Sequence, residues 1–258
     1  MSVQQAGPPP AREEDRPSRP FMEVCRMTST VPASLFRANG SSALQAVFLD
    51  MDGTLVDTEG FWWDAEVEAF ADLGHRLDEA WRDVVVGGPM TRSAGYLIEA
   101  TGADITLPEL TVLLNEKFER RIERGVPLMP GAERLLAELA RHSIPTALVS
   151  ASHRRIIDRV LASLGHDRFS LTVAGDEVVR TKPHPEPYLA AARGVGADPA
   201  LCAVVEDTAT GVAAAEAAGC RVVAVPSVAP IAPSPGRVVV RSLEEVDVPF
   251  LRTLITGI

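Results

Sequence analysis

Five short apolar runs recur along the chain, and they constrain its fold more than any other feature of the sequence. They are AVFLDM (46–51), PTALVSA (145–151), LTVAG (171–175), CAVVED (202–207) and RVVAVPS (221–227). Helical stretches that close on glycine, such as HRRIIDRVLASLG, separate the later runs. Strands that alternate with helices in this way predict an α/β fold, a Rossmann-like parallel sheet with helices on both faces.

Two segments do not follow this alternation. Residues 59–125 contain helical patterns and no convincing strand, so we expect an inserted α-helical cap over the carboxyl edge of the sheet, where such sheets bind ligands. Residues 1–42 combine proline with charges of both signs, and we expect them to form a disordered tail. The predicted core therefore comprises residues 43–58 and 126–258.

Charge and hydropathy limit the class of partner. The 258 residues carry a formal net charge of −10, with a pI near 5.0, which argues against nucleic acid because its backbone requires a basic surface. No run of about 18 apolar residues is present to cross a bilayer. Three cysteines are too few and too irregularly spaced for a disulfide framework, which suits a reducing compartment. We expect a cytoplasmic protein, without a membrane partner, that binds a small molecule.

Polar side chains cluster at or after the ends of the predicted strands. They are Asp50, Asp52, Ser150, Lys182, Glu206 and Asp207. Because the carboxyl ends of parallel strands meet at one edge of a sheet, we expect these side chains to surround one small volume. The four carboxylates would repel one another and need a cation. An oxygen-rich site without a histidine or cysteine cluster favours Mg²⁺.

These residue types suit the transfer of a phosphoryl group. Lys182 offers a fixed positive charge and Ser150 a hydroxyl donor for phosphate oxygens. A carboxylate can attack phosphorus and form an aspartyl phosphate, and the second carboxylate, two residues on, can protonate the leaving oxygen and later activate water. Gly53 lets the chain turn sharply after the first strand.

The stretches DMDGTLVDT, VSAS, TKPHPEPY and VVEDTATGVAAAEAAG, in this order, resemble the four motifs of the haloacid dehalogenase-like hydrolase superfamily. The resemblance spans residue 46 to about residue 225. The position of the insertion is similar to that of the helical cap in the branch that includes β-phosphoglucomutase and phosphoglycolate phosphatase. The resemblance implies a hydrolase that acts on a small phosphorylated metabolite with Mg²⁺ as its cofactor.

The resemblance also implies a role for each acidic residue. Asp50 is expected as the nucleophile and a metal ligand, and Asp52 as the general acid and base whose main-chain carbonyl also binds the metal. Glu206 and Asp207 match the acidic pair that holds magnesium. Of these two, we expect Asp207 to bind the ion directly and Glu206 to act through water.

Other residues are expected to contact the phosphate or the rest of the substrate. Ser150 and Lys182 match the phosphate-binding positions of the family, and Thr54 falls in the turn beside the nucleophile. In the cap, the glycines of VGGPMTRS allow a close loop from which Arg92 could reach the polar end of a substrate, with a surface ion pair as the alternative. Thr58 and Thr208 each precede a helical stretch, and we expect both to cap helices.

The expected activity is hydrolysis of a small phosphate monoester, either a sugar phosphate or a short phosphorylated acid. A sugar phosphomutase of the β-phosphoglucomutase type is the first alternative, although that enzyme carries a cap histidine where this chain has Trp62. A non-catalytic phosphate-binding or regulatory protein is the second alternative. Retention of Asp52 with all four motifs argues against it, and the oligomeric state stays open.

Overall fold

The computed structural model describes residues 44–85, 90–123 and 125–256. The predicted tail, residues 1–42, lies outside them. The described part contains a six-stranded parallel sheet in the order β3-β2-β1-β4-β5-β6. Its strands are β1 (Ala46–Leu49), β2 (Thr146–Val149), β3 (Leu171–Val173), β4 (Cys202–Glu206), β5 (Arg221–Ala224) and β6 (Arg237–Val239). The first five strands coincide with the five apolar runs, so the predicted α/β fold is confirmed.

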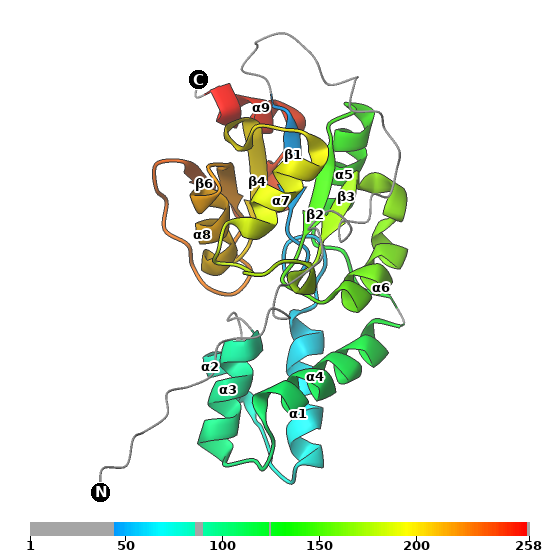
Figure 1. Ribbon diagram of the computed structural model, residues 1–258, viewed down its shortest axis with the longest axis vertical. Coiled ribbons are helices and arrows are strands. Elements are labelled where there is room, and N and C mark those ends of the chain that lie inside the picture. The colour runs from blue at the N-terminus through cyan, green and yellow to red at the C-terminus, as the bar shows by residue number, and fades with distance from the viewer. Residues whose placement is uncertain (1–43, 86–89, 124, 257–258) are drawn as a thin grey trace, which may run out of the picture.

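Helices cover both faces of this sheet (Figure 1). They are α5 (Ala132–Arg141), α6 (Arg154–Leu164), α7 (Glu186–Val195), α8 (Ala209–Ala217) and α9 (Val248–Thr256), with 3₁₀ turns at His166–Arg168, Gly175–Glu177, Pro199–Leu201 and Leu243–Glu245. Alternate residues of β1 point to opposite faces. Val47 and Leu49 belong to the core under α5, α6 and α9, whereas Phe48 packs with α7 and α8 on the other face.

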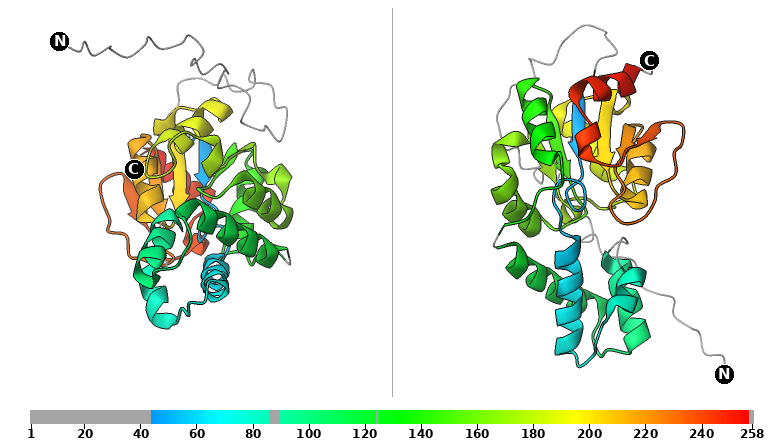
Figure 2. Two further views of the ribbon diagram at one scale, coloured as in Figure 1. Left: turned by 60° about the horizontal axis from the view of Figure 1, so that its bottom comes forward. Right: turned by 180° about the vertical axis from the view of Figure 1, so that it is seen from behind.

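Among the described residues, four helices lie between β1 and α5. They are α1 (Glu59–Asp72), α2 (Glu79–Val85), α3 (Met90–Thr101) and α4 (Leu107–Ile122). Figures 1 and 2 show them grouped at one end of the molecule, beyond the carboxyl ends of the strands. This grouping follows the expected insertion, while its separation from the core at residues 59 and 125 stays a prediction. None of the described helices is long and apolar enough to cross a membrane.

Aromatic and ionic contacts join α1 to α4. The rings of Trp62 and Phe118 stack with their centroids 3.9 Å apart. Lys117, whose side chain is 3% exposed, places Nζ 2.8 Å from Glu68 Oε1 and 2.5 Å from Asp72 Oδ2. Because this buried ammonium has two carboxylate partners, its charge is compensated within the helical group.

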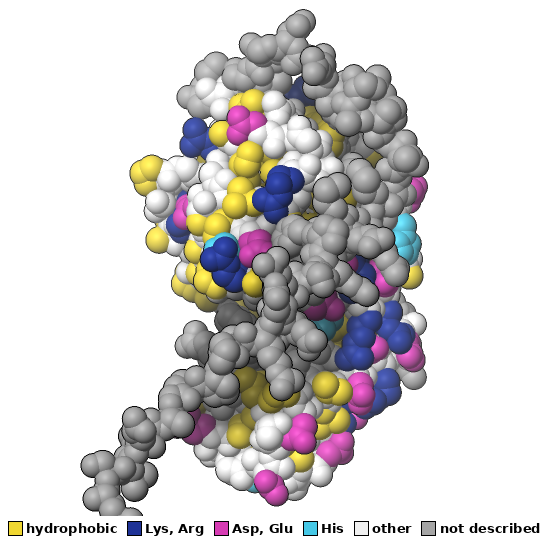
Figure 3. Space-filling view, in the orientation of Figure 1, with side chains coloured by type: hydrophobic (Ala, Val, Ile, Leu, Met, Phe, Trp, Pro, Cys, Tyr) yellow, Lys and Arg dark blue, Asp and Glu magenta, His cyan; other side chains and the backbone are white. Residues whose placement is uncertain are grey.

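Ion pairs also join α4 to α6. Arg155 Nε lies 2.5 Å from Glu119 Oε1, and Arg159 Nη2 lies 3.5 Å from Glu119 Oε2. The contact with Oε1 is an ion pair that lacks the alignment of a hydrogen bond. Figure 3 shows charged side chains of both signs gathered at the lower right of the view, where Figure 1 draws α4 and α6. The stripe of α4 that carries Glu119 therefore faces the sheet-bearing part of the molecule.

Candidate active site

The carboxyl ends of β1, β2 and β4 meet at the edge of the sheet that faces the inserted helices. Asp50 directly follows β1, and its backbone N–H donates to the carbonyl of Val205 in β4 at 3.1 Å. The chain then turns at Gly53, whose φ of +77° suits a residue without a side chain. A Cβ atom at Gly53 would also collide with the carboxylate of Asp207, so glycine permits this close approach.

Lys182 is the central positive charge of the site. Its Nζ donates to Asp50 Oδ1 at 2.6 Å, to Glu206 Oε1 at 2.6 Å and to the carbonyl of Val149 at 2.9 Å. Although burial opposes it, the neighbouring Asp50 and Glu206 carboxylates hold the pKa of Lys182 above its ordinary value. The ammonium therefore stays charged at neutral pH, beside the residue expected to attack phosphorus.

Glu206 and Asp207 end β4 and are held by different donors. Glu206 is fully buried and accepts the hydroxyl of Tyr188 at 2.8 Å as well as backbone N–H groups at the start of α8. Asp207 accepts the hydroxyls of Ser227 at 2.5 Å and Thr54 at 3.3 Å. Neutral donors thus fix the orientation of Asp207, and they add to the ammonium of Lys182 in fixing that of Glu206.

These acidic groups fit a metal ion. Carboxylate oxygens of Asp50, Glu206 and Asp207 all lie within 4.8 Å of one another. Burial, followed by the charge of Glu206, raises the pKa of Asp50 well above its ordinary value and that of Asp207 to about 7. With Asp52 nearby, four acidic side chains share this region with the ammonium of Lys182, and an all-oxygen donor set of this kind suits a hard divalent cation.

Asp52 is surrounded by hydroxyl groups. Oδ1 accepts from Thr58 Oγ1 at 2.7 Å, and Oδ2 accepts from Ser152 Oγ at 2.8 Å and Ser150 Oγ at 3.3 Å. The expected capping by Thr58 is wrong, because its side chain makes no cap hydrogen bond to α1 and donates to Asp52 instead. Thr208 does cap its helix, since its hydroxyl accepts from the N–H of Gly211 at 3.0 Å.

Most of the residues singled out in the sequence therefore lie together. The exception is Arg92, which lies on α3 and whose side chain is outside the described part of the structure. Sequence reasoning missed Ser152, Tyr188 and Ser227. Only Ser152 carried a signal, because it closes the same VSAS stretch as Ser150.

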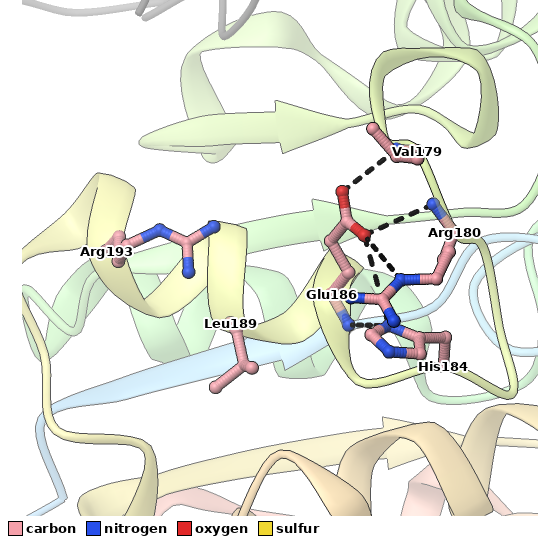
Figure 4. Close-up of a pocket in the computed structure, with 6 residues that line it drawn as sticks. All are labelled: Val179, Arg180, His184, Glu186, Leu189 and Arg193. Atoms are coloured by element: carbon pink, nitrogen blue, oxygen red, sulfur yellow. Dashed lines mark hydrogen bonds and ion pairs between the residues drawn. The ribbon is translucent and has the colours of Figure 1, made fainter. Parts of the chain in front are cut away.

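A separate surface hollow of about 450 Å³ lies on the outer side of the loop that carries Lys182. It is lined by Val179, Arg180, His184, Glu186, Leu189 and Arg193 (Figure 4). Glu186 accepts the backbone N–H groups of Val179 at 2.9 Å and Arg180 at 3.2 Å. These bonds tie the outer side of the loop to α7 while Lys182 points inward to the carboxylates.

Comparisons with known proteins agree with this geometry. Residues 44–219 match the family model for haloacid dehalogenase-like hydrolases. The chain is 33% identical over 186 residues to the putative phosphatase YhcW of Bacillus subtilis, which covers 71% of this chain and 84% of that protein. It is also 33% identical over 183 residues to the bifunctional riboflavin kinase/FMN phosphatase of Arabidopsis thaliana, which covers 70% of this chain but only 48% of that longer protein.

A solved structure extends the similarity to the fold. It contains a variant of CbbY from Rhodobacter sphaeroides in complex with xylulose-(1,5)bisphosphate, and it aligns with a TM-score of 0.69 at 25% identity over 78% of this chain and 96% of that chain. The sheet and the acidic centre at its carboxyl edge define an α/β enzyme. This chain belongs to the haloacid dehalogenase-like hydrolase family, as its motifs led us to expect.

Proposed function

We propose that this protein is a magnesium-dependent phosphatase that hydrolyses a small phosphate monoester through an aspartyl phosphate on Asp50. The observation that carries the proposal is that two neighbouring carboxylates, those of Asp50 and Asp52, lie in different environments. Asp50 lies 2.6 Å from the ammonium of Lys182, whereas Asp52 is held by three hydroxyls. Two relatives whose names include a phosphatase activity support it.

The two carboxylates would divide the chemistry between them. An oxygen of Asp50 attacks phosphorus, while Lys182 and Ser150 donate to the phosphoryl oxygens. As the bond from phosphorus to the ester oxygen breaks, Asp52 gives its proton to that oxygen. It then takes a proton from water, which attacks phosphorus and regenerates the Asp50 carboxylate.

The acidic cluster would hold the cofactor. Asp50 and Asp207 would bind Mg²⁺ directly, with the main-chain carbonyl of Asp52, and Glu206 would act through water. When bound, the ion neutralises charge on the phosphoryl oxygens and the surrounding carboxylates. Thr54, which donates to Asp207 at 3.3 Å, lies next to this group and would contact the phosphate from the same turn.

Phosphate release from p-nitrophenyl phosphate tests the proposal, with Mg²⁺, with chelator and with the variant Asp50→Asn. We expect turnover with Mg²⁺ and a loss of at least about 1,000-fold in kcat/KM for Asp50→Asn, because the covalent step requires the carboxylate. Turnover by Asp50→Asn at the rate of the parent enzyme would contradict the assignment of the nucleophile.

The mutase alternative makes a different prediction about products. A mutase returns the phosphoryl group to a sugar, so β-glucose 1-phosphate would yield glucose 6-phosphate rather than free glucose and phosphate. We expect the hydrolytic products, because the mutase histidine is replaced by Trp62, whose ring stacks on Phe118 and has no basic nitrogen to offer. Chromatography of the products decides between the two reactions.

A further inference from the structure

Lys182 uses all three of its ammonium hydrogens on acceptors within the protein. Its Nζ donates to Asp50 Oδ1 and Glu206 Oε1, each at 2.6 Å, and to the carbonyl of Val149 at 2.9 Å. An ammonium group has three donors and no more. In the proposed reaction Lys182 also donates to a phosphoryl oxygen, so that oxygen must replace one of these three acceptors.

The two carboxylates that share the ammonium differ in their other donors. Oε1 of Glu206 also accepts the hydroxyl of Tyr188 at 2.8 Å, and Oε2 accepts two backbone N–H groups that lead into α8, at 3.1 Å and 3.2 Å. The carboxylate of Asp50 accepts hydrogen bonds from Lys182 alone among the described residues. Because a buried carboxylate without donors is costly, the ammonium leaves Glu206 more readily than it leaves Asp50.

Tyr188 is held in place by its packing. Its side chain is fully buried, and its ring stacks on Phe48 of β1 with centroids 6.5 Å apart and an interplanar angle of 20°. The ammonium of Lys182 lies 5.1 Å from the centroid of the same ring. A phenol keeps its proton at neutral pH, so the hydroxyl is a neutral donor that stays with Glu206 whether or not the ammonium does.

We propose that Tyr188 is a positioning residue that allows Lys182 to exchange Glu206 for the phosphate of the substrate. This inference rests on the proposed phosphatase function. The ammonium turns one N–H from Oε1 of Glu206 to a phosphoryl oxygen and keeps its contact with Asp50. Meanwhile the Tyr188 hydroxyl keeps Oε1 hydrogen-bonded. Tyr188 thus acts through Glu206 and Lys182, and no covalent bond changes.

Tyr188→Phe tests the inference, because it removes the hydroxyl and keeps the ring against Phe48. Calorimetry with saturating Mg²⁺ should show inorganic phosphate binding about tenfold more weakly, the effect of about one hydrogen bond, since the exchange now leaves Oε1 of Glu206 without a donor. The Kd for Mg²⁺ alone should change by less than about threefold, because Lys182 still holds Glu206. The control is Tyr96→Phe on α3, a tyrosine that is 42% exposed, which should leave both constants unchanged.

Kinetics separate this positioning from a general structural role. Lys182 would contact the phosphoryl group in the bound ester and in the transition state alike, so Tyr188→Phe should raise KM for p-nitrophenyl phosphate by about tenfold with little change in kcat.

Three results would overturn the inference. They are an unchanged Kd for phosphate, as expected if the ammonium gives up Val149 instead, an equal weakening of phosphate and Mg²⁺ binding, and a lower kcat with an unchanged KM. If the parent enzyme hydrolyses p-nitrophenyl phosphate in those cases, the proposed phosphatase function survives. If the parent enzyme hydrolyses no ester, both fall together.

Discussion

At the scale of single residues, the site separates two aspartates that lie two positions apart. Asp50 faces an ammonium, and Asp52 faces only hydroxyls among its hydrogen-bond partners in the described residues. This difference follows from the turn at Gly53, which prevents Asp52 from continuing the strand. The nearby hydroxyls fix the orientation of Asp52, a requirement for a group that must transfer a proton to an oxygen of the substrate.

Thr58→Val tests this positioning. The threonine is fully buried and its hydroxyl donates to Asp52 Oδ1, so valine keeps the shape and removes one hydrogen bond to a carboxylate. We expect kcat to fall by about 10- to 100-fold with little change in KM. Thr58→Ser, which keeps the hydroxyl, should retain most of the activity. Equal kcat values for Thr58→Val and the parent enzyme would show that Asp52 does not depend on this contact.

Glu66 should make the free energy of unfolding depend on pH. Burial raises the pKa of Glu66 to about 7 from an ordinary value of 4.5. The nearby cations of α4, Lys117 and Arg121, pair with Glu68 instead. Below pH 4.5 the carboxyl is protonated in both the folded and the unfolded chain. Between pH 4.5 and 7 the unfolded chain releases the proton first, so stability falls as the pH rises.

Comparison of the parent protein with Glu66→Gln by denaturant unfolding at pH 5 and pH 8 measures this effect. Glutamine cannot ionise, so the variant should gain stability relative to the parent at pH 8, by up to about 3 kcal/mol, and much less at pH 5. A difference between the two proteins that does not change with pH would contradict the raised pKa.

At the scale of elements, the sequence predicted the strands better than the contacts between them. Five strands stand out because each contains a short apolar stretch that is buried in the sheet. β6 escaped notice because its three residues are partly exposed at the edge of the sheet. The role of Thr58 was predicted wrongly because a threonine that precedes a helix usually caps it. The sequence does not show that the folded chain brings Asp52 close enough to accept the hydroxyl of Thr58.

The motifs predicted which residues form the acidic centre. The hydrogen bonds that hold those residues in place come from segments distant in the sequence, and the motifs did not predict them. Tyr188 lies inside α7 and Ser227 follows β5, and neither position has a local pattern that predicts contact with Glu206 or Asp207. The sequence likewise gives no sign that Asn115 on α4 is buried. That Oδ1 of Asn115 has no hydrogen-bond partner among the described residues is visible only when the helices are packed.

Gly211→Ala tests the contact between α8 and β4. A Cβ atom at Gly211 would collide with the carboxylate of Glu206, which Lys182 and Tyr188 hold in place. We expect Gly211→Ala to lower kcat/KM by at least about 100-fold and to reduce stability by about 1–3 kcal/mol. The matched control is Gly95→Ala in α3, where nothing lies within 4 Å of the new Cβ, and there we expect about 0.5–1 kcal/mol of added stability. Similar effects at the two glycines would contradict this account of α8 packing.

At the scale of the whole molecule, the stability of the fold should depend on metal binding, because the site gathers four acidic side chains around one lysine, Lys182. Mg²⁺ binds the folded arrangement of Asp50, Glu206 and Asp207, so a concentration of 100 times its Kd should add about 2.7 kcal/mol to the free energy of unfolding. Asp207→Asn removes one negative charge. In chelator this variant should melt at a higher temperature than the parent protein, and Mg²⁺ should raise its Tm much less. A Tm of the parent protein that does not change when Mg²⁺ is added would contradict the metal assignment.

The central claim is that Asp50 becomes phosphorylated during turnover. The most direct measurement is to quench the enzyme during hydrolysis of p-nitrophenyl phosphate, reduce it with borohydride, which converts an aspartyl phosphate to homoserine, and locate the modified residue by peptide mass spectrometry. We predict homoserine at Asp50 and none at Asp52, and none at either position without substrate. Modification at another residue, or turnover with no modified residue, would contradict the covalent mechanism.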